Sequence, residues 1–154
     1  MKKILIGTDG SACALEAVQL GIELAAEHQA EAIVVHVAPL LDPIATAGWG
    51  YGAALPHHLD DADRASLDEA LALAADRGVH AHSKLLVGDP ADEIVTHADS
   101  VDADLIVVGS HGRGALASAF LGSVSRQVLH DARRPVLVAR GVRARTGEAG
   151  AAVA

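Results

Sequence analysis

The sequence is poor in aromatic residues, since Trp49, Tyr51 and Phe120 are the only ones it contains. Hydrophobic residues nevertheless make up 51% of the 154 residues, so a core has to be built from Ala, Val, Leu and Ile. A chain of this length favours one domain with a sizeable core. The composition therefore predicts a single domain with an aliphatic interior.

Three further features are scarce: cysteine, long apolar runs and positive charge. Cys13 is the single cysteine, which excludes an internal disulfide and fits a reducing compartment. No apolar run approaches the roughly 20 residues of a membrane-spanning helix, and the run after Met1 is too short for a signal peptide. The net charge of −8 disfavours a general nucleic-acid surface, which needs clustered cations. We therefore expect a cytoplasmic protein that binds neither membranes nor nucleic acids.

Short apolar runs alternate with amphipathic segments along the chain. Several runs are nearly continuous in Val, Ile and Leu, as in strands that are buried on both faces of a parallel sheet. The expected strands are Ile4–Ile6, Ala32–Val37, Val79–Val87, Leu105–Val108 and Val136–Ala139. The expected helices are Ser11–His28, Leu59–Arg77, Pro90–Ala98 and a segment within Ala115–Ala132. This alternation predicts a doubly wound α/β domain, with a five-stranded parallel sheet and helices on both of its faces.

Two strand orders fit this alternation, 2-1-3-4-5 and 3-2-1-4-5. In the second order the winding reverses between the first and fourth strands, and ligands bind beyond the carboxyl ends of the strands at such a point. That order brings the turn Thr8-Asp9-Gly10-Ser11 and the segment from Gly109 to Ser125 into one crevice. Two distant parts of the sequence therefore converge on one predicted site.

A glycine-rich segment follows the fourth expected strand, with Gly109, Gly112 and Gly122 ahead of Ser123 and Ser125. Glycine allows close backbone approach to a ligand, and a helix start offers unpaired N–H groups to an anion. The pattern predicts a phosphate or nucleotide site; the alternative is that the glycines only let a helix pack against the sheet. No Lys follows the glycines as it does in a P-loop, which argues against fast hydrolysis.

The spacing Gly109-x2-Gly112-x9-Gly122-Ser123 matches the G-2x-G-9x-G-[ST] signature of the ATP-binding branch of the universal stress protein family. The segments Lys3–Ser11, Gly88–Ile94 and Ala103–Gly114 also resemble that family. The resemblance implies a universal stress protein domain over residues 1–140, with the 3-2-1-4-5 sheet of adenine nucleotide alpha hydrolase-like proteins. Residues 141–154 match nothing distinctive, and we expect them to form a flexible tail.

The resemblance also implies an ATP site, with Mg²⁺ expected to accompany the nucleotide. Thr8 and Asp9 would lie on the adenosine side, and Val37 would present its backbone to adenine. Val108 and Gly109 would border the ribose and the α-phosphate. The residues implied to hold the phosphates are Gly112, Gly122, Ser123 and Val124, with Ser125 as an additional hydroxyl contact.

Four side chains near this site keep two interpretations each. Asp9 would accept hydrogen bonds from ribose hydroxyls or help hold Mg²⁺, or it would only cap the first helix. Arg113 and His111 would contact phosphate, Arg113 as a forked donor, or they would lie exposed in the loop. Cys13 would be a small buried residue or, at a helix start, a stabilised thiolate. The nine histidines show no spacing typical of a structural zinc site.

Taken with the resemblance, these features predict a nucleotide-dependent regulatory switch of the stress response, with at most slow ATP hydrolysis. The expected partners are a second copy, paired through the edge strand Val136–Ala139, and an unidentified downstream protein. The alternatives are an ATPase or nucleotidyl enzyme in the same crevice, an interaction module whose glycines only pack, and a ligand such as a cyclic nucleotide. The long segment Leu40–His58 is a candidate lid or partner surface.

Overall fold

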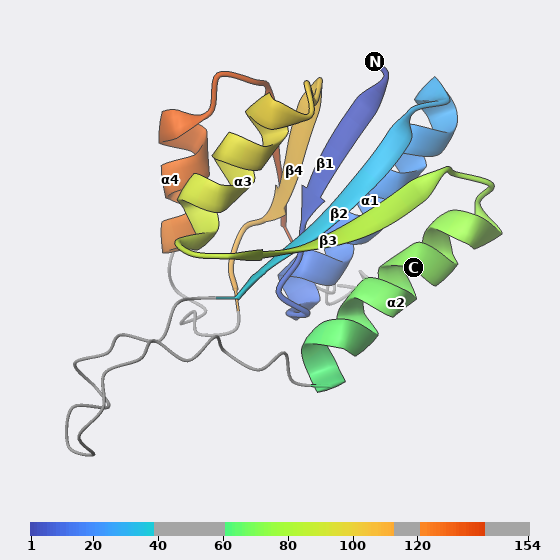
Figure 1. The fold of residues 1–154 in the computed structure, drawn as a ribbon, viewed down its shortest axis with the longest axis horizontal. Helices are drawn as coiled ribbons and strands as arrows, with labels where there is room; N and C mark the ends of the chain where they lie inside the picture. The colour runs from blue at the N-terminus through green and yellow to red at the C-terminus, as the bar shows by residue number, and fades with distance from the viewer. Residues whose placement is uncertain (39–60, 113–120, 141–154) are drawn as a thin grey trace, which may run out of the picture.

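Five parallel strands form one sheet in the order β3-β2-β1-β4-β5, in a computed structural model that describes residues 1–38, 61–112 and 121–140 (Figure 1). The strands are β1 (Lys3–Gly7), β2 (Glu31–Ala38), β3 (Ala81–Val87), β4 (Leu105–Gly109) and β5 (Val136–Ala139). Of the two predicted strand orders, 3-2-1-4-5 is confirmed. The central strand β1 pairs with β2 on one side and with β4 on the other, so the winding reverses beside β1.

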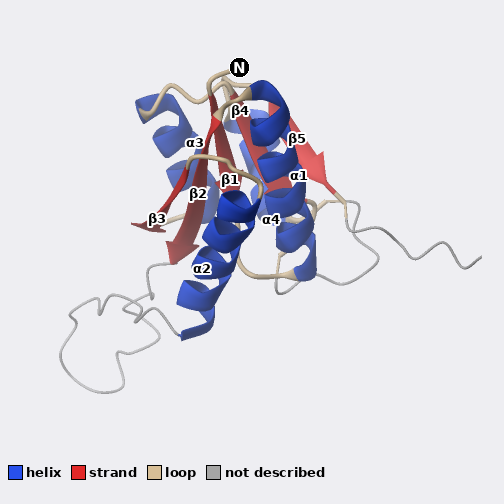
Figure 2. Ribbon diagram, turned by 90° about the vertical axis from the view of Figure 1, so that its right-hand side faces the viewer, coloured by secondary structure: helices blue, strands red, loops and turns tan. Residues whose placement is uncertain are grey.

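Two pairs of helices cover the two faces of this sheet, which lies between them in Figure 2. The helices are α1 (Ala12–His28), α2 (Asp61–Asp76), α3 (Pro90–Ser100) and α4 (Ser123–Asp131). Residues of α1 and α2 pack in one hydrophobic cluster, and residues of α3 and α4 pack in the other. The predicted doubly wound arrangement is therefore confirmed.

Alternation along the strands assigns each apolar side chain to one of these clusters. Ile4 and Ile6 of β1 face α1 and α2, whereas Leu5 between them faces α3 and α4. Among the described residues, which include none of the three aromatic ones, the largest fully buried side chains are all Ile, Leu or Val. Helix α1 lies so close to β1 that a Cβ added at Gly21 would be 2.6 Å from Ile6 Cδ1.

One strand is shorter than predicted: β3 begins at Ala81 rather than at Val79. The Val79 N–H donates to the Ala74 carbonyl at 2.9 Å, so this residue is part of the turn that ends α2. Gly78 has φ +66°, which ends the helix in the left-handed conformation expected of a C-terminal glycine. Val79 is buried nevertheless, in the hydrophobic cluster that α1 and α2 form with the sheet.

Helices α1, α3 and α4 all begin at the edge where the parallel strands end. Ser11 caps α1 by accepting a hydrogen bond from the Ala14 N–H, and Asp89 caps α3 by accepting from the N–H groups of Ala91 and Asp92. Gly122, the N-cap of α4, makes no such side-chain bond. Helix α4 therefore begins without a side-chain cap from its N-cap residue, and its first N–H groups have no intrahelical partner.

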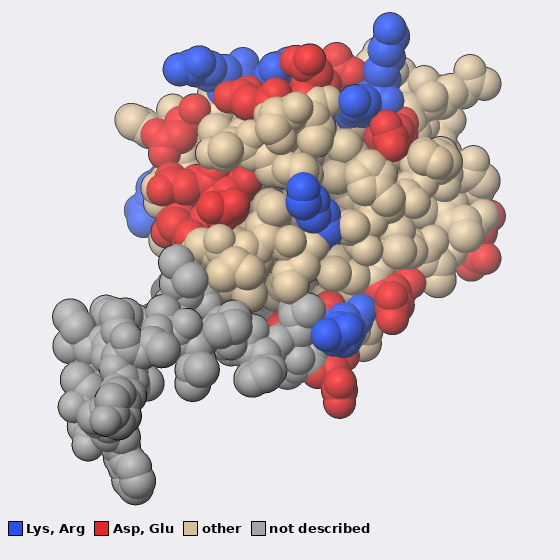
Figure 3. Space-filling model, in the orientation of Figure 1, with Lys and Arg blue, Asp and Glu red and all other residues tan. Residues whose placement is uncertain are grey.

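Several sequence predictions fall on residues outside the described ranges: the segment Leu40–His58, Arg113 and the tail 141–154. No helix among the described residues is long and apolar enough to cross a membrane. The edge position predicted for Val136–Ala139 is confirmed, since β5 ends the strand order. On the face drawn in Figure 3, acidic and basic side chains lie next to each other along the upper rim, where the strands begin.

Candidate functional site

A cleft of about 610 Å³ opens at the carboxyl ends of the strands, where the winding of the sheet reverses. Its volume lies within the range of about 300–1,000 Å³ that is usual for small-molecule sites. Every described residue predicted to contact a nucleotide lines this one cleft. These residues are Thr8, Asp9, Val37, Val108, Gly109, Gly112, Gly122, Ser123, Val124 and Ser125.

Aliphatic side chains form one wall of the cleft. Val35 and Val37 come from the end of β2, and Pro90 and Ile94 come from the first turns of α3. Val35, Pro90 and Ile94 were not among the site residues predicted from the sequence. The proline at the start of a helix was a usable signal, because helices that follow β-strands begin at the same edge as the cleft.

The structure gives Gly109 a packing requirement that is independent of any ligand. A Cβ added there would lie 2.7 Å from the carbonyl carbon and oxygen of Cys13, in the first turn of α1. Gly112 differs, because among the described residues its added Cβ would meet only the Asp9 carboxylate, 2.5 Å from Oδ2. The packing interpretation thus applies to Gly109, whereas Gly112 faces a side chain of the cleft.

Hydrogen bonds join the start of α4 to the end of β4. The Gly122 N–H donates to the Ser110 carbonyl at 2.7 Å, and the buried Ser125 hydroxyl lies 3.1 Å from the same oxygen. The Ser125 hydroxyl therefore holds α4 against the β4 loop. Ser123, by contrast, is exposed at the first position of the helix. The uncapped N–H groups beside it form the anion-binding arrangement that a helix N-terminus provides.

The β1–α1 turn settles which residue caps the first helix: it is Ser11, not Asp9. The Asp9 carboxylate instead accepts a hydrogen bond at 3.0 Å from the N–H of Ser11, the residue just before the helix. The Ser11 hydroxyl lies 3.3 Å from the His111 carbonyl, to which it donates. This contact links the turn to the glycine loop, although the two are separated by about a hundred residues of sequence.

A buried ionisable pair that was not predicted from the sequence contacts this turn. His36 Nδ1 is 2.9 Å from the Thr8 carbonyl oxygen, and His36 Nε2 is 3.3 Å from Asp63 Oδ1 in the first turn of α2. Because a carbonyl oxygen only accepts hydrogen bonds, Nδ1 has to carry a proton. The exposed fractions of the two side chains are 6% and 4%. His36 thus connects the cleft-lining Thr8 to helix α2.

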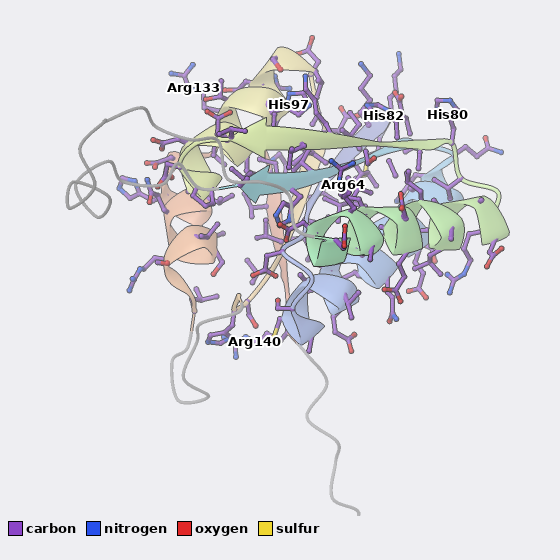
Figure 4. All side chains as sticks on the ribbon, turned by 60° about the horizontal axis from the view of Figure 1, so that its bottom comes forward. Arg64, His80, His82, His97, Arg133 and Arg140 are labelled. Carbon is purple, nitrogen blue, oxygen red and sulfur yellow. The ribbon has the colours of Figure 1, made fainter. Side chains whose placement is uncertain are left out.

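The other candidate side chains lie less favourably for a shared site. Cys13 is half-buried rather than fully buried, and its sulfur lies 3.7 Å from the Ser110 hydroxyl. His80 and His82 both approach Glu31, at 3.6 and 3.2 Å, near the beginning of β3 and away from the cleft (Figure 4). No group of three potential metal ligands occurs within the ranges 1–38, 61–112 and 121–140.

The sheet order and the position of the cleft define a doubly wound α/β protein with its main cavity at the switch point of the winding. The chain belongs to the universal stress protein family, whose sequence profile matches residues 1–140. It is 36% identical to universal stress protein MJ0531 of Methanocaldococcus jannaschii, over 90% of this chain and 82% of that protein. It is 35% identical to universal stress protein YxiE of Bacillus subtilis, over 90% and 98% of the two chains.

Solved structures share the fold as well. Hypothetical protein MJ0577 superposes with a TM-score of 0.76 at 29% identity, over 90% of this chain and 95% of that one. A universal stress protein in complex with cAMP gives a TM-score of 0.67 at 30% identity, over 92% and 98% of the chains. The universal stress protein of Archaeoglobus fulgidus in complex with dAMP gives 0.65 at 25% identity, over 90% and 98%. Nucleotide complexes therefore occur among proteins of this fold.

Proposed function

We propose that this protein binds an adenine nucleotide, ATP accompanied by Mg²⁺, in the cleft at the carboxyl ends of β1 and β4. The observation that supports it most strongly is the convergence of an aliphatic wall, the Thr8–Asp9 turn and the uncapped start of α4 on one cavity. A nucleotide needs these three environments together, for its base, its ribose and its phosphates. The cAMP and dAMP complexes of similar proteins support the same class of ligand.

The two ends of the cleft would divide the ligand between them. Val35, Val37 and Ile94 would contact the base, because these apolar side chains can exclude water from its flat faces. The N–H groups of Ser123 and Val124 would donate to phosphate oxygens at the positive end of the α4 dipole. Asp9 would accept hydrogen bonds from the ribose or approach the metal ion.

The residues present suit Mg²⁺ only as a companion of the nucleotide. Asp9 is the one carboxylate among the described residues that line the cleft. Mg²⁺ is commonly held by one or two carboxylates together with substrate phosphates and water. The nucleotide itself would therefore supply most of the ligands, and Asp9 would supply at most one carboxylate oxygen.

In the proposed role, nucleotide binding shifts the protein between two conformations and so regulates a partner in the stress response, with at most slow hydrolysis. A ligand shifts such an equilibrium only by its difference in affinity for the two states. Two contacts would transmit that difference: Ser11 to the His111 carbonyl, and Thr8 through His36 to α2. A cytoplasmic location and a homodimer paired through β5 remain predictions of the same proposal.

Calorimetric titration of nucleotide-stripped protein with Mg-ATP tests the binding. We expect saturable binding near one site per chain. Ser123→Asp places a carboxylate at the proposed phosphate position, where it suits the helix dipole and leaves folding intact. It should weaken binding at least about tenfold through like-charge repulsion. Ala65→Asp, which adds the same charge to the exposed side of α2, is the matched control and should bind like wild type.

Two results would contradict the proposal. If folded, stripped wild-type protein gives no binding at several temperatures, the interaction-module alternative becomes the better account. If Ser123→Asp binds Mg-ATP as tightly as the Ala65→Asp control, the phosphates do not lie at the start of α4.

A further inference from the structure

We infer that Arg126 binds the phosphate groups beyond the first. The cleft would therefore prefer nucleoside di- and triphosphates to monophosphates and cyclic monophosphates. The inference rests on the proposed function and makes it more specific. It assigns a selective role to a residue that lies just after the glycine and serine positions predicted from the sequence.

Arg126 is positioned above the proposed phosphate site. Arg126 lies in α4, four residues after the N-cap Gly122, and both residues line the cleft. Residues four apart lie on one face of a helix, and helical side chains tilt toward the N-terminus. The Arg126 side chain therefore extends along the cleft toward the uncapped first turn, beyond the N–H groups of Ser123 and Val124.

The charges of the cleft explain why this position matters. Among its described lining residues, Arg126 is the one Lys or Arg, and Asp9 is the one carboxylate. A helix N-terminus supplies about half a unit of positive charge, which suits one phosphate group but not several. Each additional phosphate adds negative charge farther from that terminus. Among the described lining residues, the arginine one turn along the same helix is the cation that can neutralise it.

The guanidinium of Arg126 is available for such a ligand. It is exposed, and within the part of the chain that the structure describes it makes no ion pair or side-chain hydrogen bond. Arg134 provides the contrast, because it donates to Asp99 and Asp102 at 3.1 and 3.0 Å. A planar guanidinium can donate two parallel hydrogen bonds to phosphate, which favours arginine over lysine at such a position.

Titrations of four ligands against three variants test this selectivity. The ligands are Mg-ATP, Mg-ADP, AMP and cAMP, and the variants are Arg126→Gln, Arg126→Lys and the control Arg133→Gln. Arg133 is exposed in the connection that precedes β5, whereas Arg140 follows β5, and Figure 4 shows the two at opposite ends of that strand. The control removes an equal charge from the end of the sheet that lacks the cleft.

We expect wild type and Arg133→Gln to bind Mg-ATP more tightly than AMP or cAMP. Arg126→Gln should weaken Mg-ATP binding about tenfold, the loss expected for a charge-assisted hydrogen bond, and leave AMP and cAMP within about twofold. Arg126→Lys should retain part of the preference, because it keeps the charge but loses the fork.

The possible failures can be told apart. If wild type binds the nucleotides and Arg126→Gln keeps the wild-type ratio of ATP to AMP affinity, the inference is wrong and the proposed function stands. An equal loss for all four ligands overturns it too, since that would show a general disturbance of the cleft. If wild type binds none of the four, the proposed function fails, and the inference fails with it.

Discussion

The two ends of the parallel sheet differ in what their polar groups contact. At the end where the strands begin, the N–H groups of Lys2 and Lys3 donate to the Asp104 carboxylate, and Arg134 donates to Asp99 and Asp102. At the end where they finish, the chain leaves a cleft of about 610 Å³ beside the uncapped start of α4. The carboxylates of Asp99, Asp102 and Asp104 at the first end accept hydrogen bonds from the chain itself, whereas N–H groups at the second end face a cavity.

This difference separates the paired carboxylates at one end of the sheet from the proposed binding site at the other. The connections before the strands are held to each other by the hydrogen bonds to Asp99, Asp102 and Asp104. The connections after the strands are held from behind, by His36 on the Thr8 carbonyl and by Ser125 on the Ser110 carbonyl. These two buried contacts support the turn and the loop that border the cleft at the carboxyl edge, the edge of the sheet where the strands end.

Removing the buried support should have the largest effect on stability. His36→Leu leaves the Asp63 carboxylate without its imidazole partner, and breaking a buried pair in this way costs about 3 kcal/mol. Urea denaturation would measure the loss. His82→Leu, which removes a half-exposed histidine near the beginning of β3, is the matched control and should change stability little. Equal stability of the two variants would show that the carboxyl edge does not depend on the His36–Asp63 pair.

Alanine substitutions at two glycines of the same loop should distinguish a glycine packed against α1 from a glycine that faces the cleft. Gly109→Ala forces a Cβ against the backbone of Cys13 and should cost about 2 kcal/mol. Within the described ranges, the methyl group of Gly112→Ala meets the Asp9 carboxylate alone, whose rotation costs about 1 kcal/mol or less. Thermal and urea unfolding of both variants checks the order. A larger loss for Gly112→Ala would contradict the assignment of Gly109 to packing.

A smaller change is expected when an ion pair at the opposite end is removed. Hydrogen bonds to Asp102 and Asp99 raise the pKa of Arg134, so it stays charged throughout the accessible pH range. Surface ion pairs nevertheless contribute little, because water and salt screen them. Arg134→Gln should therefore destabilise the protein less than Gly109→Ala and leave nucleotide affinity unchanged. A marked loss of affinity would show that the two ends are coupled.

The smallest effect concerns acid stability. Hydrogen bonds from the backbone N–H groups of Lys2 and Lys3 lower the pKa of Asp104 below its ordinary 3.8. A lowered carboxylate pKa stabilises the folded state above pH 3.8, and this contribution is lost as the pH falls through the folded value. Asp104→Asn should therefore reduce the dependence of stability on pH below about 4. An unchanged acid-unfolding profile would contradict this account of the amino edge.

The fold and the cleft were predictable because their signals are local. Buried strands read as continuous apolar runs, and the spacing of Gly109, Gly112 and Gly122 marks the loop beside α4. The pairing of His36 with Asp63 was not predictable, since it depends on how α2 is rotated against the sheet. The place of Ile94 in the cleft wall was not predictable for the same reason. In a sequence, an apolar residue on a helix face gives the same pattern whether it faces the core or a cleft.

The position of the nucleotide is tested most directly by amide NMR shifts of the folded, stripped protein on saturation with Mg-ATP. The account predicts the largest changes at Thr8, at Val37 and across Gly109 to Val124, with little change at Lys3, Asp104 or Val136. Changes concentrated at the beginnings of the strands, or absent throughout, would contradict the assignment of nucleotide binding to the carboxyl edge.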